Sequence, residues 1–542
     1  MVPATKVSRQ GYSVELASLL PADVAALKKD LTMVPRTNAG GPQQPKPTSY
    51  PLYRANASKI YCPVNFGLKR FGPPTKGWAL DAGEPMSEAA RSSFRGELRP
   101  VQVEAVRDFL CVTQAEPPSA TGGILSLPCG FGKTICAIFA VAKLGRRTMI
   151  IVHKLFLEAQ WIERIAEFLP GASVGAIRAD KVDVEGRDIV IASLQSLALK
   201  DYDPALFAQF GTLVVDECHR IGTECFSQAL RKVVFRHTLG LSATVQRKDG
   251  CTNAFTFSLG DVLYRVKRSD AGVMVVQARF FDADECYSRE ELVYGGKLNT
   301  ARMINNITRW EPRTRAIADA IVGSLVREPG RKVLVLSDRK DHLSAIKALV
   351  EADAPRLIEA GVDIAACSRA AAAAAQAAAA NTAAQTKRKA KAVSVDCGDV
   401  CGFYVGGMKP AALDASAARK VVLATFAFAS EGFDVAAMDT LVLASPKTDI
   451  EQSVGRILRL RAQERTRMPL ILDFADDFSV FARQAAKRRT FYKRHGYSVL
   501  ASMDALWDRA CGEAATNDSD SGSSAPDADN EPIAFVQEDD SA

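Results

Sequence analysis

The sequence predicts an α/β protein with two tandem domains, each built on a parallel sheet. Two observations support this: short β-branched runs recur along the chain, and helix-length segments such as "ICAIFAVAKL" separate them. Strands that alternate with helices at this spacing are typical of βαβ units. The predicted strands are 123–127, 148–152, 188–192, 212–216 and 237–244 in the first set, and 332–338, 420–425, 439–446 and 469–474 in the second.

We expect four segments along the 542 residues. Residues 1–97 form a small N-terminal accessory region that packs on the first domain, with stacking of its aromatic and basic residues on nucleic-acid bases as the alternative. Residues 98–268 and 269–500 form the two α/β domains, and 501–542 form an acidic, disordered tail. The segment "YRVKRSDAGVMVVQARFFDADECYSREEL", between the two sets of strands, is predicted to be irregular.

An alanine-rich stretch at about 365–393 interrupts the second domain and ends in the basic cluster "KRKAK". Alanine favours helix but offers little surface to bury, so we expect an exposed insertion. A nucleic-acid-binding arm or a localisation signal is the alternative.

Composition indicates an intracellular protein with a polyanionic partner. Hydrophobic residues make up 47% of the chain, yet no run approaches the roughly 20 apolar residues of a membrane span. The N-terminus has no signal-peptide pattern, and the twelve cysteines are scattered like reduced thiols. The net charge is +7, and the residues from Gly512 onward hold nine acids and no Lys or Arg, which leaves about +16 on the rest.

The stretch "LSLPCGFGKT", from residue 125 to residue 134, has the pattern of a phosphate-binding loop between a strand and a helix. Glycines let backbone N–H groups turn inward around phosphates, and the helix N-terminus adds positive charge. Lys133 would meet the phosphates as a mobile cation, and the hydroxyl of Thr134 would ligate Mg²⁺. A plain strand–turn–helix is the alternative, because Leu127 stands where the simplest motif has glycine. The predicted cofactors are ATP and Mg²⁺, and the predicted loop residues are Pro128, Cys129, Gly130, Phe131, Gly132, Lys133 and Thr134.

Two carboxylates end another predicted strand, in "TLVVDECHRIG". Asp216 would hold the magnesium ion, and Glu217 would orient or activate the attacking water. His219 would read the nucleotide state. Two acids at a strand end are also compatible with a solvated cap, but together with a phosphate loop in the same sheet they predict nucleotide hydrolysis.

These motifs resemble those of the superfamily 2 helicases in their DExH form, and the resemblance extends from about residue 98 to residue 497. It implies two RecA-like domains and ATP-driven movement on nucleic acid. "LRPVQ" is similar to the adenine-recognising Q element, and "VLATFAFASEGFD" (422–434) is similar to motif V. The residues implied are Gln102 for adenine, Ser242, Ala243 and Thr244 for coupling hydrolysis to domain movement, and Gly432 and Asp434 near the nucleotide.

The segment "DIEQSVGRILR" (449–459) resembles motif VI of the same group. Gln452, Arg456 and Arg459 are separated by four and three residues, so on a helix they would share one face. Two arginines there can reach a phosphate bound by the first domain and stabilise the charge of the transition state. A basic helix face exposed to water is the alternative.

A split nucleotide site predicts that ATP closes the domains and that hydrolysis lets them part, which changes the grip on a strand held across both. For contacts to that strand the resemblance implies regions at the strand ends, represented by His153, Lys154, Ser193, Gln195, Arg339 and Thr425. A further group of basic residues is expected to form a solvated helix face, and binding to the nucleic-acid backbone is the alternative. The group is Lys487, Arg488, Arg489, Lys493 and Arg494.

Among superfamily 2 branches, "LPCGFGKT", the DExH box and "LRPVQ" resemble XPB-type DNA helicases. The sequence resembles still more closely the XPB-related helicases of large DNA viruses and some phages, through "FYVGGMK", "LVLASPKTDIEQSVGRILR" and "FARQAAKRRTFYKRHGY". Arg247-Lys248-Asp249 departs from the Arg-Glu-Asp of that type. The resemblance implies a DNA helicase or translocase in viral transcription, repair or replication. It implies nucleic acid as a partner, with DNA favoured over RNA, and transcription machinery as a further one. A monomer that acts in a virus factory, virion or host nucleus fits this reading. The alternatives are an RNA helicase, a duplex translocase without strand separation, and a binding or virion protein with a vestigial motor.

Overall fold

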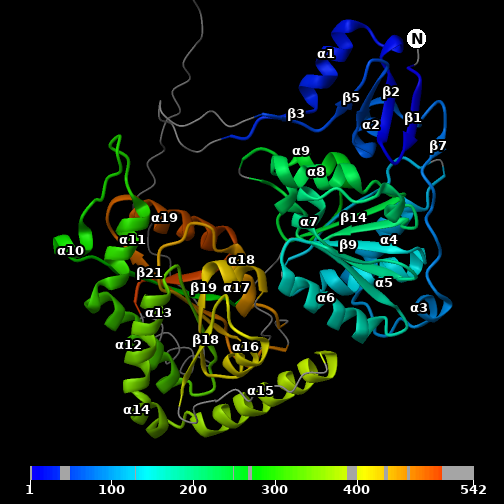
Figure 1. Cartoon of the computed structure of the whole chain (residues 1–542). Coiled ribbons are helices and arrows are strands. Elements are labelled where there is room, and N and C mark those ends of the chain that lie inside the picture. The colour runs from blue at the N-terminus through cyan, green and yellow to red at the C-terminus, as the bar shows by residue number, and fades with distance from the viewer. Residues whose placement is uncertain are drawn as a thin grey trace, which may run out of the picture.

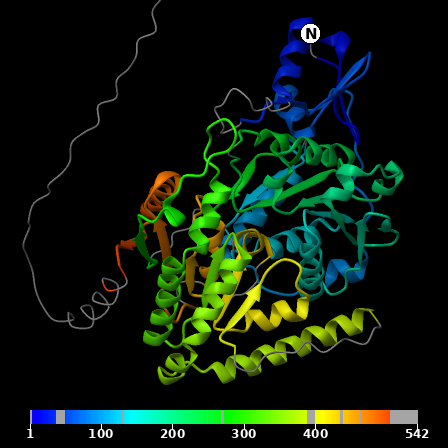
Figure 2. The ribbon, with the colours of Figure 1, turned by 60° about the vertical axis from the view of Figure 1, so that its left-hand side comes forward.

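The computed structural model describes residues 3–36, 49–116, 118–128, 130–247, 249–266, 272–386, 399–432, 438–460, 464–502 and 504. Sheets of five, eight and seven strands and a two-stranded ribbon organise these residues (Figures 1 and 2). The eight- and seven-stranded sheets confirm the predicted α/β class with two parallel-sheet domains. Several residues and segments discussed above lie outside the described residues: Cys129, Lys248, Asp434, the basic cluster at 387–391 and the acidic tail from 505.

The N-terminal accessory region is a small α/β unit that packs on the first large domain (Figure 1). Its sheet has the order β5-β6-β2-β1-β7, antiparallel except for the β1–β7 pair. Its core residues Val7, Tyr12 and Ile60 belong to one buried cluster with Cys251 and Ala254 of that domain. The elements are β1 (Thr5–Ser8), β2 (Gly11–Glu15), α1 (Pro21–Asp30), β3 (Thr32–Met33), β4 (Tyr50–Pro51), β5 (Arg54–Ala55), β6 (Lys59–Cys62), α2 (Val64–Phe71) and β7 (Trp78–Ala79).

The first large sheet has the order β11-β10-β12-β9-β13-β14-β8-β15, and only the β10–β11 pair is antiparallel. Its central strands are buried along their whole length, as expected when helices cover both faces. All five strands predicted in this half are present. The elements are α3 (Glu88–Ser92), α4 (Pro100–Thr113), β8 (Gly122–Ser126), α5 (Lys133–Leu144), β9 (Thr148–Val152), α6 (Leu155–Phe168), β10 (Val174–Arg178), β11 (Lys181–Asp183), β12 (Ile189–Ser193), α7 (Leu194–Leu199), β13 (Thr212–Val215), α8 (Glu224–Lys232), β14 (His237–Ser242), α9 (Asn253–Leu259) and β15 (Val262–Arg265).

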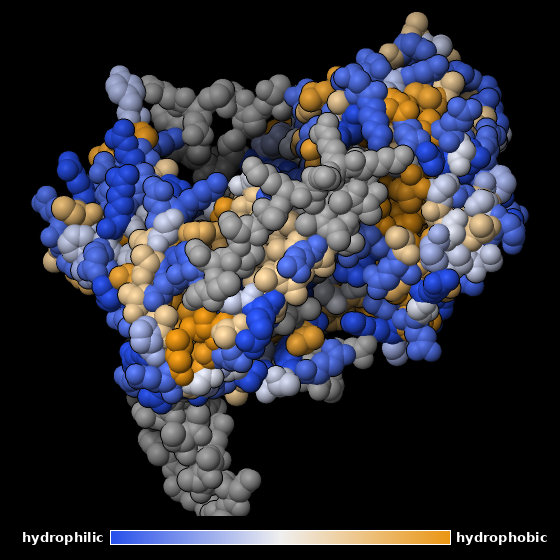
Figure 3. Space-filling model, turned by 60° about the horizontal axis from the view of Figure 1, so that its bottom comes forward, coloured by the Kyte–Doolittle hydropathy of each residue, from blue (hydrophilic) through white to orange (hydrophobic). Residues whose placement is uncertain are grey.

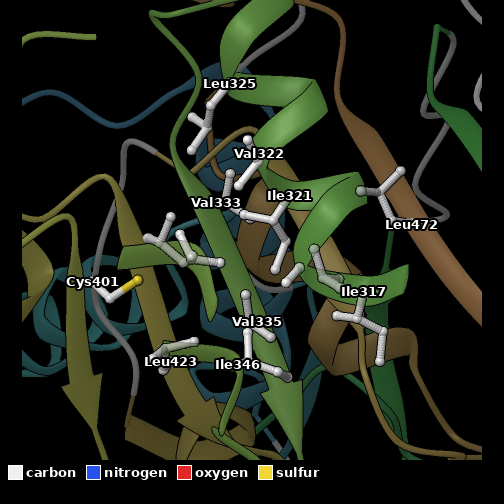
Figure 4. Packing of buried hydrophobic residues seen from close by; sticks show 14 of the residues in the cluster. Ile317, Ile321, Val322, Leu325, Val333, Val335, Ile346, Cys401, Leu423 and Leu472 are labelled. Atoms are coloured by element: carbon white, nitrogen blue, oxygen red, sulfur yellow. The ribbon is translucent and has the colours of Figure 1, made fainter. Parts of the chain in front are cut away.

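The second large sheet, with the order β18-β19-β17-β20-β21-β16-β22, is parallel throughout. Figure 4 shows part of its core, where Ile321 and Val322 of α12 pack against Val333 and Val335 of β17. The elements are β16 (Met274–Phe280), α10 (Glu285–Ser288), α11 (Thr300–Arg309), α12 (Glu311–Arg327), β17 (Val333–Ser337), α13 (Lys340–Ala352), α14 (Ala354–Glu359), α15 (Ile364–Thr386), β18 (Cys401–Tyr404), α16 (Pro410–Ala417), β19 (Val421–Thr425), α17 (Phe426–Gly432), β20 (Thr440–Leu443), α18 (Glu451–Ile457), β21 (Leu470–Asp476), α19 (Ser479–Arg494) and β22 (Ser498–Leu500).

The segment predicted to be irregular contains β16, which pairs with β21 and β22 inside this sheet. The prediction was wrong because Gln277 and Arg279 interrupt an otherwise apolar run. Tertiary contacts satisfy the buried amide: Gln277 Nε2 donates to Asp473 Oδ2 at 2.9 Å and to the Ala485 carbonyl at 3.2 Å.

The alanine-rich stretch forms most of α15, and part of this helix is buried, contrary to the prediction of an exposed insertion. Ala371 and Ala375 pack with Ala415 of α16 in a small cluster. Small side chains let the two helices approach closely, so alanine supplies a packing surface here. In Figure 1, α15 lies at the edge of the second domain, next to α16.

Two buried ion pairs hold the segment that leads into α18. Arg313 donates to Asp476 at 2.6 and 2.9 Å and to the Ala444 carbonyl at 2.7 Å. Arg488 donates to Asp473 at 2.7 to 3.0 Å and to the Lys447 carbonyl at 2.9 Å. Arg488 is 1% exposed, so for this residue both predictions, a solvated helix face and binding to the nucleic-acid backbone, were wrong. Its neighbours Lys487 and Arg489 are exposed.

No helix in the described part of the chain is long and apolar enough to cross a membrane. Figure 3 shows a mostly hydrophilic face that carries limited apolar patches.

Replacement of Arg488 by Ala is expected to lower the free energy of unfolding of the second domain by about 3–5 kcal/mol, because it leaves the Asp473 carboxylate buried without its cation. Urea denaturation followed by circular dichroism measures this loss. Arg489→Ala, on the exposed side of the same helix, is the matched control and should change stability by less than about 0.5 kcal/mol. Equal effects of the two variants would contradict the assignment.

Candidate nucleotide site

The predicted phosphate loop connects β8 to α5. Gly130 and Gly132 have φ of +82° and +78°, a conformation that favours glycine, and α5 begins at Lys133. The Lys133 ammonium donates to the Leu127 carbonyl at 3.3 Å and lies 3.6 Å from Glu217 Oε1. The lysine side chain therefore lies between the loop and the acidic pair.

Gln102 of α4 holds the loop from the side. Its Nε2 donates to the Phe131 carbonyl at 2.8 Å, and its Oε1 accepts from the Arg99 backbone N–H at 2.8 Å. A Cβ on Gly132 would lie 2.3 Å from Gln102 Nε2, so a glycine is required for this approach. The predicted adenine residue is thus adjacent to the loop and buried against it.

The acidic pair follows β13, and its charges are balanced by groups from three other elements. Asp216 accepts from Trp161 Nε1 of α6 at 3.0 Å, and burial together with the neighbouring Glu217 raises the pKa of Asp216. Burial would also raise the pKa of Glu217, but the positive charges of Lys133 and Arg456 outweigh this effect and lower it. No pattern in the sequence marks Trp161, because it lies in an ordinary amphipathic helix, α6.

His219 connects the acidic pair to the predicted coupling triplet. Its Nδ1 lies 2.9 Å from Ser242 Oγ and 3.4 Å from Glu217 Oε2, and Ser242 Oγ donates to the Thr244 carbonyl at 2.6 Å. Burial lowers the pKa of His219 to about 4, so its imidazole is neutral near pH 7. Ala243 and Thr244 line a cleft of about 920 Å³ between the two domains.

Motif VI brings the second domain to the loop. Arg456 is 7% exposed and acts electrostatically on Glu217, and Gln452 lines the interdomain cleft. The helix ends at Ile457, so helical spacing does not apply to Arg459 as expected. Instead, the Arg459 backbone packs on the loop: a Cβ on Gly130 would lie 3.1 Å from Arg459 Cα. Gly432 is the last residue of α17.

The residues proposed for nucleic-acid contact form two groups, one at strand ends of each large domain. His153 is 7% exposed, and burial lowers its pKa to about 4. Its carbonyl accepts from Gln195 Nε2 at 2.6 Å, and Gln195 Oε1 accepts from Ser193 Oγ at 3.0 Å. Lys154, the N-cap of α6, is half-buried beside them.

In the second domain, Arg339 follows β17 and Thr425 ends the neighbouring parallel strand β19, so both lie at the same sheet edge. The Arg339 guanidinium donates to Asn305 Oδ1 at 2.5 Å and to the Ala301 carbonyl at 3.0 Å. The structure therefore positions Arg339 through α11, while Thr425 is half-buried at the end of its strand.

Oxygen donors beside Lys133 fit a magnesium–nucleotide complex. Thr134 follows Lys133 in the first turn of α5, and the Asp216 and Glu217 carboxylates lie across from it. Glu217 Oε2 is buried and accepts no hydrogen bond from the residues that the structure describes. Magnesium in phosphate sites commonly takes one or two carboxylates and completes its shell with phosphate oxygens and water.

Sequence comparisons relate this chain to helicase-like proteins. Residues 95–247, which contain the loop, the acidic pair and the coupling triplet, match the family described as "Type III restriction enzyme, res subunit". The chain is 29% identical over 501 residues to a "Putative ATP-dependent RNA helicase" of Acanthamoeba polyphaga mimivirus, and the match covers 91% of this chain and 86% of that protein.

More distant relatives come from other large DNA viruses. A protein with the same description from African swine fever virus is 24% identical over 388 residues, 69% of each chain. A "Putative helicase" of Invertebrate iridescent virus 6 is 23% identical over 417 residues, 75% of this chain and 83% of that one. By these similarities the chain is helicase-like, and its relatives are proteins of large DNA viruses.

Proposed function

We propose that the chain is an ATP-dependent motor that moves on nucleic acid, a helicase or translocase that hydrolyses ATP with Mg²⁺ between its two domains. One observation carries the proposal: the Lys133 ammonium lies 3.6 Å from the Glu217 carboxylate in the first domain, Arg456 of the second domain acts electrostatically on Glu217, and the Arg459 backbone packs on the loop at Gly130. Neither domain alone supplies all of these charges, so hydrolysis depends on how the domains meet.

Each residue has a chemical task in this proposal. Lys133 and the loop N–H groups neutralise the phosphates, Gln102 holds the adenine end, and Thr134 and Asp216 hold the metal. A bound Mg²⁺ would supply charge neutralisation at the β- and γ-phosphate oxygens. Glu217, which remains ionised because Lys133 and Arg456 lower its pKa, accepts a hydrogen bond from the attacking water. Arg456 and Arg459 stabilise the charge that develops on the transferred phosphoryl group.

The substrate proposed first is DNA, from the similarity of the motifs to XPB-type helicases, with a role in viral transcription, repair or replication. RNA is the second candidate, because the relatives from mimivirus and African swine fever virus carry the name of RNA helicases. Movement along duplex DNA without strand separation is a third mode of the same motor.

The first test is the steady-state ATPase rate without nucleic acid and with single-stranded DNA, duplex DNA or single-stranded RNA. We expect stimulation, strongest with DNA, and a loss of at least about 100-fold in kcat for Lys133→Ala and for Glu217→Gln. Lys143→Ala, at the exposed far end of the same helix, should behave like the wild type. An ATPase rate that no nucleic acid changes would refute the proposal of a nucleic-acid motor. A tenfold preference for RNA would make RNA, and not DNA, the proposed substrate.

The second test concerns the Trp161–Asp216 hydrogen bond. Trp161→Phe removes a donor that lowers the pKa of Asp216, so this pKa should rise further. Because the carboxylate must be ionised to hold Mg²⁺, the acidic limb of the kcat/KM profile should move to higher pH, and the Mg²⁺ requirement should increase. Trp310→Phe, which removes a comparable bond to Asp282 outside the site, is the matched control. Unchanged profiles in both variants would show that Trp161 only packs.

A further inference from the structure

The segment after the coupling triplet connects the accessory region to the acidic pair. Arg247 donates to both carboxylate oxygens of Asp249, at 3.0 Å through Nε and by a second, shorter bond through Nη2. Its Nη1 donates to the carbonyl of His219. The guanidinium thus bridges the segment after β14 and the turn that carries Glu217 and His219.

Asp249 is held from several directions. Its Oδ1 accepts from the Cys251 backbone N–H at 3.0 Å, and its carbonyl accepts from the Arg36 backbone N–H of the accessory region at 2.9 Å. The hydrogen bonds from Arg247 come first among the causes that lower the pKa of Asp249. The Asp249 carboxylate is therefore ionised near pH 7 and accepts hydrogen bonds from both Arg247 and the Cys251 backbone.

The accessory region makes its own contact with the same turn. Tyr50 of β4 is 2% exposed, and its hydroxyl donates to the Gly222 carbonyl at 2.8 Å. A Cβ on Gly222 would lie 2.3 Å from Arg247 Nε, so the absent side chain at Gly222 makes room for the guanidinium. Cys251 and Ala254, directly after Asp249, are buried in the accessory core.

The turn held by these contacts carries Glu217 and His219, two residues of the proposed nucleotide site. Glu217 has φ of +47°, an uncommon backbone conformation for a residue with a side chain, and must be held by its surroundings. Contacts with the turn come from Arg247 at the His219 carbonyl and from Tyr50 at the Gly222 carbonyl. These two contacts lie two and five residues beyond Glu217.

We infer that Arg247, Asp249 and Tyr50 are positioning residues through which the N-terminal accessory region sets the geometry of the Glu217–His219 turn and thereby the rate of ATP hydrolysis. The inference rests on the proposed function. It assigns to Arg247 and Asp249 an internal role, because both side chains are engaged by protein groups. It also makes the accessory region a regulator: a partner or nucleic acid that shifts it would change hydrolysis.

The experiment uses the full chain and compares Tyr50→Phe with Tyr12→Phe. Each variant loses one tyrosine hydroxyl bond to a backbone carbonyl, but the Tyr12 bond, to Gly72 at 3.0 Å, lies within the accessory region. Tyr50→Phe should lower kcat about three- to tenfold with the KM for ATP within about twofold. Tyr12→Phe should retain the wild-type kcat, with a melting temperature within about 2 °C of that of Tyr50→Phe. Arg247→Gln should lower kcat further than Tyr50→Phe.

A second readout does not depend on activity. Amide hydrogen exchange of residues 217–222 should accelerate in Tyr50→Phe and Arg247→Gln but not in Tyr12→Phe. Equal kcat and equal exchange in the two tyrosine variants would overturn the inference while leaving the motor intact. A wild-type chain without nucleic-acid-stimulated ATPase would refute the proposed function, and the exchange experiment would still decide whether the accessory region holds the turn.

Discussion

Two adjacent carboxylates, Asp216 and Glu217, lie half-buried directly after β13, and the geometry of the candidate site depends on how their charges are balanced. Burial alone favours protonation of both. Lys133 from α5 and Arg456 from the second domain keep Glu217 ionised, and Trp161 from α6 donates a hydrogen bond to Asp216. The two carboxylates therefore interact with groups from α5, α6 and the second domain, and we call this set of groups the electrostatic unit of the site.

The second domain is built to present Arg456 and Arg459 to that unit. Between β20 and α18 the chain passes through residues 444–450, and this segment is fixed by Arg313 at the Ala444 carbonyl and by Arg488 at the Lys447 carbonyl. Both arginines are buried and paired with carboxylates of β21. Such pairs contribute little net stability compared with apolar packing, but they tolerate only a narrow geometry. Here they hold the Ala444 and Lys447 carbonyls of the segment that leads to α18.

The accessory region contacts the turn that carries Glu217 and His219 through Tyr50, and Arg247 contacts the same turn. The polar contacts of Tyr50 and Arg247 act on backbone carbonyls, so they constrain the path of the chain and leave the carboxylates free to bind ligands. The accessory region shares a hydrophobic core with the residues after Asp249. Movement of this small unit would therefore be transmitted through a packed interface as well as through hydrogen bonds.

The sequence by itself determined the class of the fold and the local motifs. Alternation of apolar strands with amphipathic helices is encoded residue by residue. The phosphate loop can be recognised from its glycines and Lys133, because phosphate binding needs backbone N–H groups and a cation close together in the chain. Tertiary structure alone decided the rest. Strand β16 was hidden because Gln277 is satisfied by distant partners, and the buried state of Arg488 depends on Asp473 of another element. Trp161, Tyr50 and Arg247 meet the turn only after folding, since contacts between residues far apart in sequence leave no periodic pattern along the chain.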